Sequence, residues 1–225
     1  RLKPAAFTPY DLFAENYTRL LWLFEGWTSY YDDLLLVRSG VVDADRHLGL
    51  LAKTATQVLT TPGRLRQSLA EASFDAWIKF YRPDENSANA TVSYYAKGAL
   101  LALALDLQLR ERGASLDALL RALWERYGRS GEGMGEEAPF AVLHEMAGSR
   151  LARWLERMVQ GTEDPPLAAL LRRFGVQWRE IAAALPDTGL RFERDSMRVA
   201  AVRRASPAEG AGIAPRDELV AIDRL

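Results

Sequence analysis

The sequence predicts a mainly α-helical protein that is followed by a small β-containing part. From 11 to 174, apolar residues recur at helical spacing, and Gly, Pro and capping residues separate the segments. From Pro186 onward, apolar and polar residues alternate in the manner of strands. We therefore divide the chain into a helical subdomain, 1–185, and a β-containing part, 186–225. A chain of 225 residues is long enough for one good core, or for one domain and a fragment of another.

The helices are expected in a definite order. Asp43 and Ser115 are typical N-caps, and Gly40 and Gly113 are placed to end helices. The segment 91–112 is nearly apolar all round in its middle, which is typical of a helix buried in the core. Polar loops are expected over 82–89 and 128–137. The predicted helical segments are a long helix that follows a loop within 11–39, then 43–59, 66–80, 91–112, a segment that begins at 115, 139–147, 149–159 and 167–174.

The C-terminal part has the pattern of short strands around one short helix. Strands are expected over 190–193, 197–202 and 217–223, and a helix within 206–213.

Composition excludes several classes of protein. The net charge of −1 gives no indication of nucleic-acid or membrane-surface binding. No apolar run approaches the roughly 18 residues that a membrane span requires. The chain has no cysteine, which excludes disulfides and cysteine-ligated zinc and is compatible with any compartment. We expect the natural N-terminus to be missing, so the localisation is not predicted.

Glu25 is a single carboxylate in an otherwise apolar and aromatic run, 20–31. Helical spacing places it on one face with four neighbours, Leu21, Trp22, Thr28 and Ser29. A carboxylate there is costly to bury unless a metal ion, a Lys or an Arg compensates it. The pattern alone favours a structural salt bridge.

The residues around Glu25 form a recognisable motif. Trp-Leu-Phe-Glu-Gly-Trp-Thr-Ser-Tyr-Tyr, 22–31, resembles the third-ligand motif of the glycyl aminopeptidase family of zinc metallopeptidases, and the flanks 3–7 and 32–40 match as well. The resemblance implies that Glu25 is a zinc ligand. In such enzymes His-Glu-x-x-His supplies the other two ligands and the general base. The resemblance places that motif shortly before Arg1.

The histidines of the chain do not supply this motif. There are only two, His47 and His144, and neither begins a His-Glu-x-x-His. We expect His47 at the surface and His144 to be an ordinary helix residue. Because catalytic zinc sites use three protein ligands and a water, we expect this chain alone to bind no zinc tightly and to be inactive.

A second segment, 92–98, resembles the Tyr-x-Lys-Gly helix start of the larger aminopeptidase branch of these zinc enzymes. The resemblance implies that the Tyr95 hydroxyl stabilises the oxyanion formed when zinc-activated water attacks a peptide carbonyl. The alternative is that Tyr94 and Tyr95 are core aromatics. Lys97 is expected to pair with a carboxylate. Tyr30 and Tyr31 are candidates to line the substrate cleft.

The C-terminal part resembles the beginning of a bacterial protease-type PDZ domain. The segment that carries the resemblance is Ser-Pro-Ala-Glu-Gly-Ala-Gly-Ile, 206–213. Arg216 and Arg224 stand where that pattern usually has Gly. The chain stops before the second helix, so half of a peptide-binding groove would be absent.

Together the resemblances imply the helical half of a thermolysin-like catalytic domain and the start of a PDZ domain. The implied function is a zinc-dependent aminopeptidase that removes N-terminal residues, glycine among them, from peptides. The alternative is a non-catalytic helical scaffold with a PDZ module, and the two are distinguished by whether His-Glu-x-x-His precedes Arg1. The partners expected are a peptide substrate and a peptide ligand of the complete PDZ domain. We also expect self-association through an exposed apolar face that contains Trp22, Phe24 or Trp27.

Overall fold

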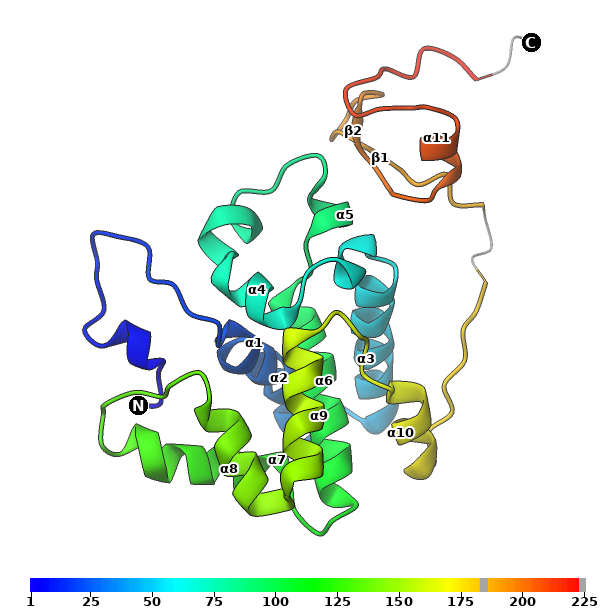
Figure 1. Cartoon of the computed structure of the whole chain (residues 1–225). Helices are drawn as coiled ribbons and strands as arrows, with labels where there is room; N and C mark the ends of the chain where they lie inside the picture. Colours follow the sequence, from blue (N-terminus) through cyan, green and yellow to red (C-terminus); the bar gives the residue numbers. More distant parts are fainter. Residues whose placement is uncertain (183–185, 223–225) are drawn as a thin grey trace.

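Helix α6 (Tyr94–Arg110) is the centre of the helical part of this computed structural model, which describes residues 1–182 and 186–222 (Figure 1). Thirteen of its seventeen residues are buried. The segment forms a helix because Ala and Leu dominate it and because Ser93 caps its start by accepting a hydrogen bond from the Ala96 N–H. A helix that is apolar on every side must be surrounded by other elements, and this one is.

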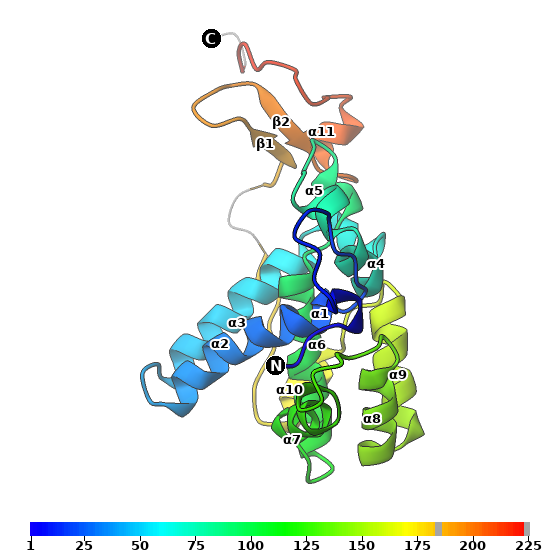
Figure 2. The same ribbon diagram turned by 90° about the vertical axis from the view of Figure 1, so that its left-hand side faces the viewer.

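Most of the other helices contact α6 directly, while α8 packs on α7 and α9, and α5 packs on η2. Figure 2 shows α2 and α3 on one side of it and α8 and α9 on the other. The helices are α1 (Leu21–Phe24), α2 (Gly26–Arg38), α3 (Ala44–Leu59), α4 (Leu69–Phe74), α5 (Ser87–Ala90), α7 (Leu116–Leu123), α8 (Ala138–Ala147), α9 (Ser149–Gln160) and α10 (Leu167–Arg173), with 3-10 turns η1 (Ala5–Phe7) and η2 (Pro62–Leu65) and π-helical turns η3 (Ala76–Phe80) and η4 (Trp124–Gly128). The predicted mainly α-helical class is confirmed.

Local capping explains where several helices begin. Asp43 accepts a hydrogen bond from the Arg46 N–H and Ser115 accepts one from the Ala118 N–H, so both predicted caps are confirmed. Ser68 forms a capping box with Glu71 and starts α4, two residues later than the sequence pattern predicts.

Two predicted boundaries were wrong. The long helix expected before Gly40 is interrupted at Glu25, between α1 and α2. The segment 82–89, expected to be a loop, contains the start of α5, because the Asp84 carboxylate accepts hydrogen bonds from the Asn86 N–H and the Ser87 hydroxyl.

The C-terminal module, which we define as residues 186–222, contains an antiparallel pair of strands, β1 (Leu190–Phe192) and β2 (Val199–Val202), and a short helix, α11 (Pro207–Gly210). Its small core is formed by Val199, Val202 and Ala208, against which Leu190, Phe192 and Ile213 pack.

The third strand predicted in the C-terminal module is not formed over 217–222. Backbone hydrogen bonds join 216–219 to 197–199, among them Val199 N–H to the Asp217 carbonyl at 2.8 Å, but the pairing is limited to an isolated bridge between Arg198 and Glu218. Val220 is 89% exposed, so no second face holds the segment in place. Asp223 and Arg224 lie outside the described residues, as does residue 185, at which the predicted helical subdomain ends.

Of the three aromatic residues predicted on an exposed apolar face, Trp22 and Trp27 are buried and Phe24 is half-buried. Trp22 and Trp27 are 0% and 1% exposed and pack edge to face, with ring centroids 5.8 Å apart. The exposed aromatics nearest to the tyrosines at the start of α6 are instead Trp77 and Tyr81. Self-association stays a prediction, but Trp22 and Trp27 would not carry it. No helix in the described part of the chain is both long and apolar enough to cross a membrane.

Arg216 adopts a backbone conformation that favours glycine, with φ of 77°. This left-handed conformation costs an L-residue about 1 kcal/mol. We expect Arg216→Gly to stabilise the C-terminal module by about that amount, because the ion pair that it removes, with Glu85, is exposed and worth little. Hydrogen exchange of the β2 amides measures the effect. Arg198→Gly, which does not relieve a positive φ, should do the opposite, and stabilisation by both variants would refute the strain argument.

Candidate functional site

Gly26 and Gly98 allow the backbones of α2 and α6 to touch where the two helices cross. A Cβ atom at Gly26 would lie 2.7 Å from the Gly98 Cα and 2.9 Å from the Tyr94 carbonyl oxygen. Helices that meet through larger side chains are kept 8–10 Å apart. The two glycines therefore bring Glu25, which precedes Gly26, to the end of α6 at which Tyr94 and Tyr95 begin.

Glu25 lies at the junction of α1 and α2 and is half-buried. Its backbone continues the helical hydrogen bonding, since its N–H donates to the Leu21 carbonyl and its own carbonyl accepts from the Ser29 N–H. Its carboxylate has no hydrogen bond or salt bridge with any residue of 1–182 and 186–222. The structural salt bridge that the sequence pattern alone favours is thus not found in this part of the chain.

Three tyrosine hydroxyls form a chain beside the crossing. The Tyr94 hydroxyl donates to that of Tyr81 at 3.3 Å, and the Tyr81 and Tyr95 hydroxyls share a hydrogen bond of 3.3 Å. The Tyr94 and Tyr95 rings stack with centroids 4.7 Å apart, and Phe80 packs against both. Sequence analysis missed Tyr81, which reaches the site because its N–H bonds to the Ala76 carbonyl in the π-helical turn η3.

The surroundings keep the tyrosines protonated. Burial is the largest cause that raises the pKa of Tyr95 to about 12, followed by the hydrogen bond with Tyr81, and the negative charge of Glu25 adds to the increase. Burial also raises the pKa of Tyr94 above its ordinary value. At neutral pH the Tyr95 hydroxyl is therefore a proton donor, as its predicted role requires.

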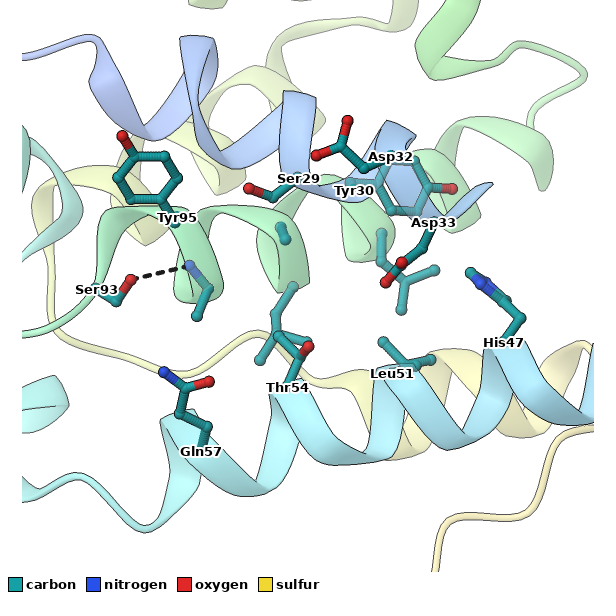
Figure 3. A pocket seen from close by; sticks show the side chains of 14 residues that line it. Ser29, Tyr30, Asp32, Asp33, His47, Leu51, Thr54, Gln57, Ser93 and Tyr95 are labelled. Atoms are coloured by element: carbon teal, nitrogen blue, oxygen red, sulfur yellow. Dashed lines mark hydrogen bonds between the residues drawn. The ribbon is translucent and has the colours of Figure 1, made fainter. Parts of the chain in front are cut away.

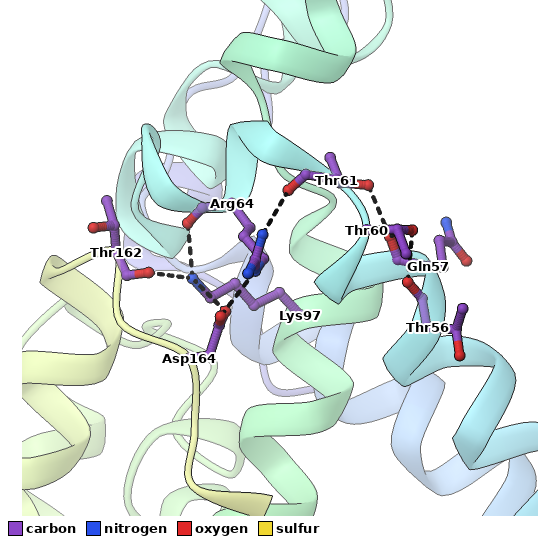
Figure 4. A network of polar contacts seen from close by, with 8 residues as sticks. All are labelled: Thr56, Gln57, Thr60, Thr61, Arg64, Lys97, Thr162 and Asp164. Carbon is purple, nitrogen blue, oxygen red and sulfur yellow. Dashed lines mark hydrogen bonds and ion pairs between the residues drawn. The ribbon is translucent and has the colours of Figure 1, made fainter. Parts of the chain in front are cut away.

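Lys97 ties the first turns of α6 to η2 and to the segment between α9 and α10 (Figure 4). It is 1% exposed, and its ammonium donates to the carbonyl oxygens of Arg64 and Thr162 at 3.1 and 2.9 Å. The Asp164 carboxylate lies 3.6 Å away, so the prediction that Lys97 pairs with a carboxylate is confirmed. Burial lowers the pKa of Lys97 despite this partner. Lys97 thus anchors the helix that carries Tyr95.

A cavity of about 320 Å³ extends from Tyr95 between α2, α3 and α6 (Figure 3). Tyr95 and Ser93 stand near one end of it and His47 near the other, and Asp32 and Asp33 line it from α2. His47 is half-buried in its wall, whereas the sequence suggested a surface position. Sequence analysis missed Thr54 and Gln57, which share the wall with His47 because they lie on the same face of α3.

Tyr30 and Tyr31, predicted as cleft candidates, have different positions. Tyr30 lines the cavity with its ring, but its hydroxyl donates to Asp106 at 2.8 Å. Tyr31 does not line this cavity, and its hydroxyl donates to Asp117 at 2.7 Å. Burial raises the pKa of both tyrosines. Both hydroxyls thus attach α2 to α6 or α7, and a role in binding substrate stays a prediction for each.

A complete metal site is not formed by the residues described. No group of three or more His, Cys, Asp or Glu side chains that could hold a metal ion is found among 1–182 and 186–222. His144 is exposed on α8. Glu25 is thus the one predicted ligand that the structure brings to the tyrosines.

Comparison with known families agrees with this arrangement. The sequence model of the M61 glycyl aminopeptidases matches residues 1–101, a range that contains both Glu25 and Tyr95. Residues 1–101 belong to the M61 glycyl aminopeptidase family. Both catalytic motifs predicted from the sequence therefore lie in the part of the chain that carries the family membership.

The structure as a whole resembles a solved member of a peptidase family. It matches the crystal structure of an aminopeptidase N family protein from Idiomarina loihiensis with a TM-score of 0.89 and 36% sequence identity. The match covers 98% of this chain and 41% of that chain, so this chain spans less than half the length of the solved protein. A comparison with curated proteins gave no match.

Proposed function

We propose that this chain is the helical part of a zinc-dependent aminopeptidase, in which Glu25 is a zinc ligand and Tyr95 is the donor to the oxyanion. The observation that carries the proposal is the contact of Gly26 with Gly98 and Tyr94, which places Glu25 beside the first turn of α6, where Tyr95 lies. Membership of residues 1–101 in the M61 glycyl aminopeptidase family supports the same reaction class.

The environment of Glu25 fits a metal ligand. A half-buried carboxylate normally has a compensating partner, and among the described residues this one has no hydrogen bond or salt bridge. A carboxylate oxygen is one of the ligands that zinc uses in catalytic sites. We propose that a His-Glu-x-x-His segment outside this chain supplies the remaining ligands and the general base. When bound, zinc would polarise the scissile carbonyl and activate the attacking water.

The part of the reaction that this chain would perform is stabilisation of charge. Attack on a peptide carbonyl develops negative charge on its oxygen, and a positioned phenol stabilises that charge as it forms. Tyr95 has the properties needed, because it is protonated at neutral pH and is held by Tyr81, Tyr94 and Phe80. Lys97 and the Gly26–Gly98 contact would keep the Tyr95 phenol in a fixed position relative to Glu25.

The choice of aminopeptidase over endopeptidase rests on family membership. We propose that the substrate is a peptide with a free N-terminus, glycine being one of the residues removed, and that the C-terminal module is the start of a PDZ domain. The competing proposal, a non-catalytic scaffold, gains support only if the full-length protein lacks His-Glu-x-x-His.

The Tyr95→Phe variant of the full-length enzyme tests the proposal. We expect turnover to fall about a hundredfold, because a single oxyanion donor is worth on the order of 3 kcal/mol. Zinc content should not change, since only a hydroxyl is lost. Turnover by steady-state kinetics and zinc by elemental analysis are the two measurements.

Tyr94→Phe is the matched control, because it removes the neighbouring hydroxyl from the same chain of hydrogen bonds. Its effect on turnover should be much smaller than that of Tyr95→Phe. Equal turnover in the parent enzyme and in Tyr95→Phe would return Tyr95 to a packing role, and a larger loss in Tyr94→Phe would show that the wrong tyrosine was chosen.

A further inference from the structure

Asn89, on α5, joins the helical part to the C-terminal module. Its side-chain amide donates to the Val202 carbonyl at 2.8 Å, and its side-chain oxygen accepts from the Arg204 N–H at 2.8 Å. The residue is 7% exposed. A carbonyl and an N–H two residues further along are the groups that a neighbouring strand would use. The side chain of Asn89 thus serves as an added hydrogen-bonding partner at the end of β2.

The seam, by which we mean the contact between the helical part and the C-terminal module, is otherwise open and weakly held. Among the residues that the structure describes, the other polar contact across it is Arg216 with Glu85 at 3.5 Å, with side chains 74% and 45% exposed. Such pairs contribute little. A cavity of about 290 Å³ also lies at the seam, between η2 and α5 on one side and β1 and β2 on the other. The buried amide of Asn89 is therefore the specific link at this seam, whose position Figure 1 shows next to α5.

Asn89 lies within the connection 82–92, which includes α5, is called loop 82–92 below and carries the tyrosines of the candidate site at its two ends. Tyr81 precedes the loop, Tyr94 and Tyr95 follow it, and the Tyr81–Tyr95 hydrogen bond of 3.3 Å closes it. On the way back to α6 the Val92 N–H donates to the buried Gln67 side chain at 3.0 Å. A displacement of the loop at Asn89 would therefore change the spacing of Tyr81 and Tyr95.

We infer that Asn89 is a positioning residue through which the C-terminal module holds loop 82–92, and with it Tyr81 and Tyr95, in place. A buried amide that loses its partners is costly, so the loop and the module stabilise each other's position. The module is then a support of the candidate site and not an independent appendage. The inference rests on contacts within the chain and does not depend on the proposed peptidase activity.

The Asn89→Ala variant of the whole chain tests the link directly. The chain has no cysteine, so cysteines introduced at the exposed positions Lys53 and Arg194 can carry a unique pair of spin labels. We expect a narrow distribution of label-to-label distances in the parent and a broad one in Asn89→Ala. Amide exchange in the peptide 82–95 should accelerate on the order of tenfold, with α7 as the internal reference.

Asn89→Asp separates hydrogen bonding from packing. At neutral pH the introduced carboxylate faces the Val202 carbonyl and cannot donate, so the distance distribution should broaden. Once protonated in mild acid, the carboxyl can donate to Val202 and still accept from the Arg204 N–H. Among the nearby charged side chains, Arg216 is paired with Glu85 and Arg203 with Asp187. The Arg204 side chain is exposed, so its attraction to the introduced carboxylate would be weak. In acid, the C-terminal module should therefore dock on loop 82–92 again and the distance distribution should narrow for Asn89→Asp, but not for Asn89→Ala.

Glu85→Gln is the control, because it removes the exposed ion pair of the seam and leaves Asn89 intact; both measurements should match the parent. A narrow distance distribution in Asn89→Ala would overturn the inference. A broad distribution without faster exchange over 82–95 would show that the module is tethered by Asn89 but does not hold the tyrosines, which would also overturn it. If the distance distribution of Asn89→Asp stayed broad in acid, the effect would come from packing, and the role inferred for the Asn89 hydrogen bonds would be overturned.

Discussion

Gly26→Ala should destabilise the chain by about 3 kcal/mol or more. The new Cβ atom would lie 2.7 Å from the Gly98 Cα and 2.9 Å from the Tyr94 carbonyl oxygen, so backbone, and not a flexible side chain, would have to move. Overpacking a core typically costs 1–3 kcal/mol, and two backbones in contact cannot yield as side chains do. The melting temperature should fall on the order of 10 °C, which calorimetry or circular dichroism can measure.

Gly49→Ala is the matched control for this variant. Gly49 lies within α3, and a Cβ atom there would meet nothing within 4 Å. The same substitution should therefore stabilise the chain by about 1 kcal/mol, because alanine is the better helix former. If Gly26→Ala proved as stable as Gly49→Ala, the close approach of α2 and α6 would be refuted, together with the explanation for the position of Glu25.

Glu25→Ala should remove most of the activity of the full-length enzyme. Loss of a residue that merely supports a ligand costs roughly 10–100-fold in metal affinity or activity, so loss of a ligand should cost more. Glu25→Gln should behave in the same way, since it keeps the size of the side chain and loses its charge. Zinc content and turnover are the measurements, and circular dichroism distinguishes an emptied metal position in a folded variant from a misfolded protein.

Glu156→Gln provides the comparison, because it removes one negative charge from an exposed position on α9. It should keep both zinc and turnover. Full zinc occupancy and normal turnover in Glu25→Ala would show that Glu25 is structural and would favour the scaffold alternative.

The parts of the fold that follow from local chemistry could be predicted from the sequence. A cap is a hydrogen bond between a side chain and an N–H three residues on, as at Asp43 and Ser115, so neighbouring residues suffice to indicate it. The burial of α6 follows from its apolar composition in the same way.

The parts that depend on distant contacts could not be predicted. The pattern marked Trp22 and Trp27 as apolar but could not show that this chain's own helices cover them. Asn89 looked like an ordinary loop residue, because its two partners lie more than a hundred positions away. One is Val202, the last residue of β2, and the other is Arg204, which follows the strand. Glu25 and Tyr95 were found through family resemblance, and only the structure showed that two glycines place them together.

The π-helical turn η3 makes the candidate site sensitive to the winding of a helix. Each residue of an α-helix turns the chain by about 100°, and the hydrogen bond from the Tyr81 N–H to the Ala76 carbonyl spans one residue more than an α-helical bond does. Removing a single residue from this turn would rotate Tyr81 away from Tyr94 and Tyr95. An insertion or deletion at 76–80 could thus alter the site in a relative whose Glu-Gly and Tyr-x-Lys-Gly motifs are both intact.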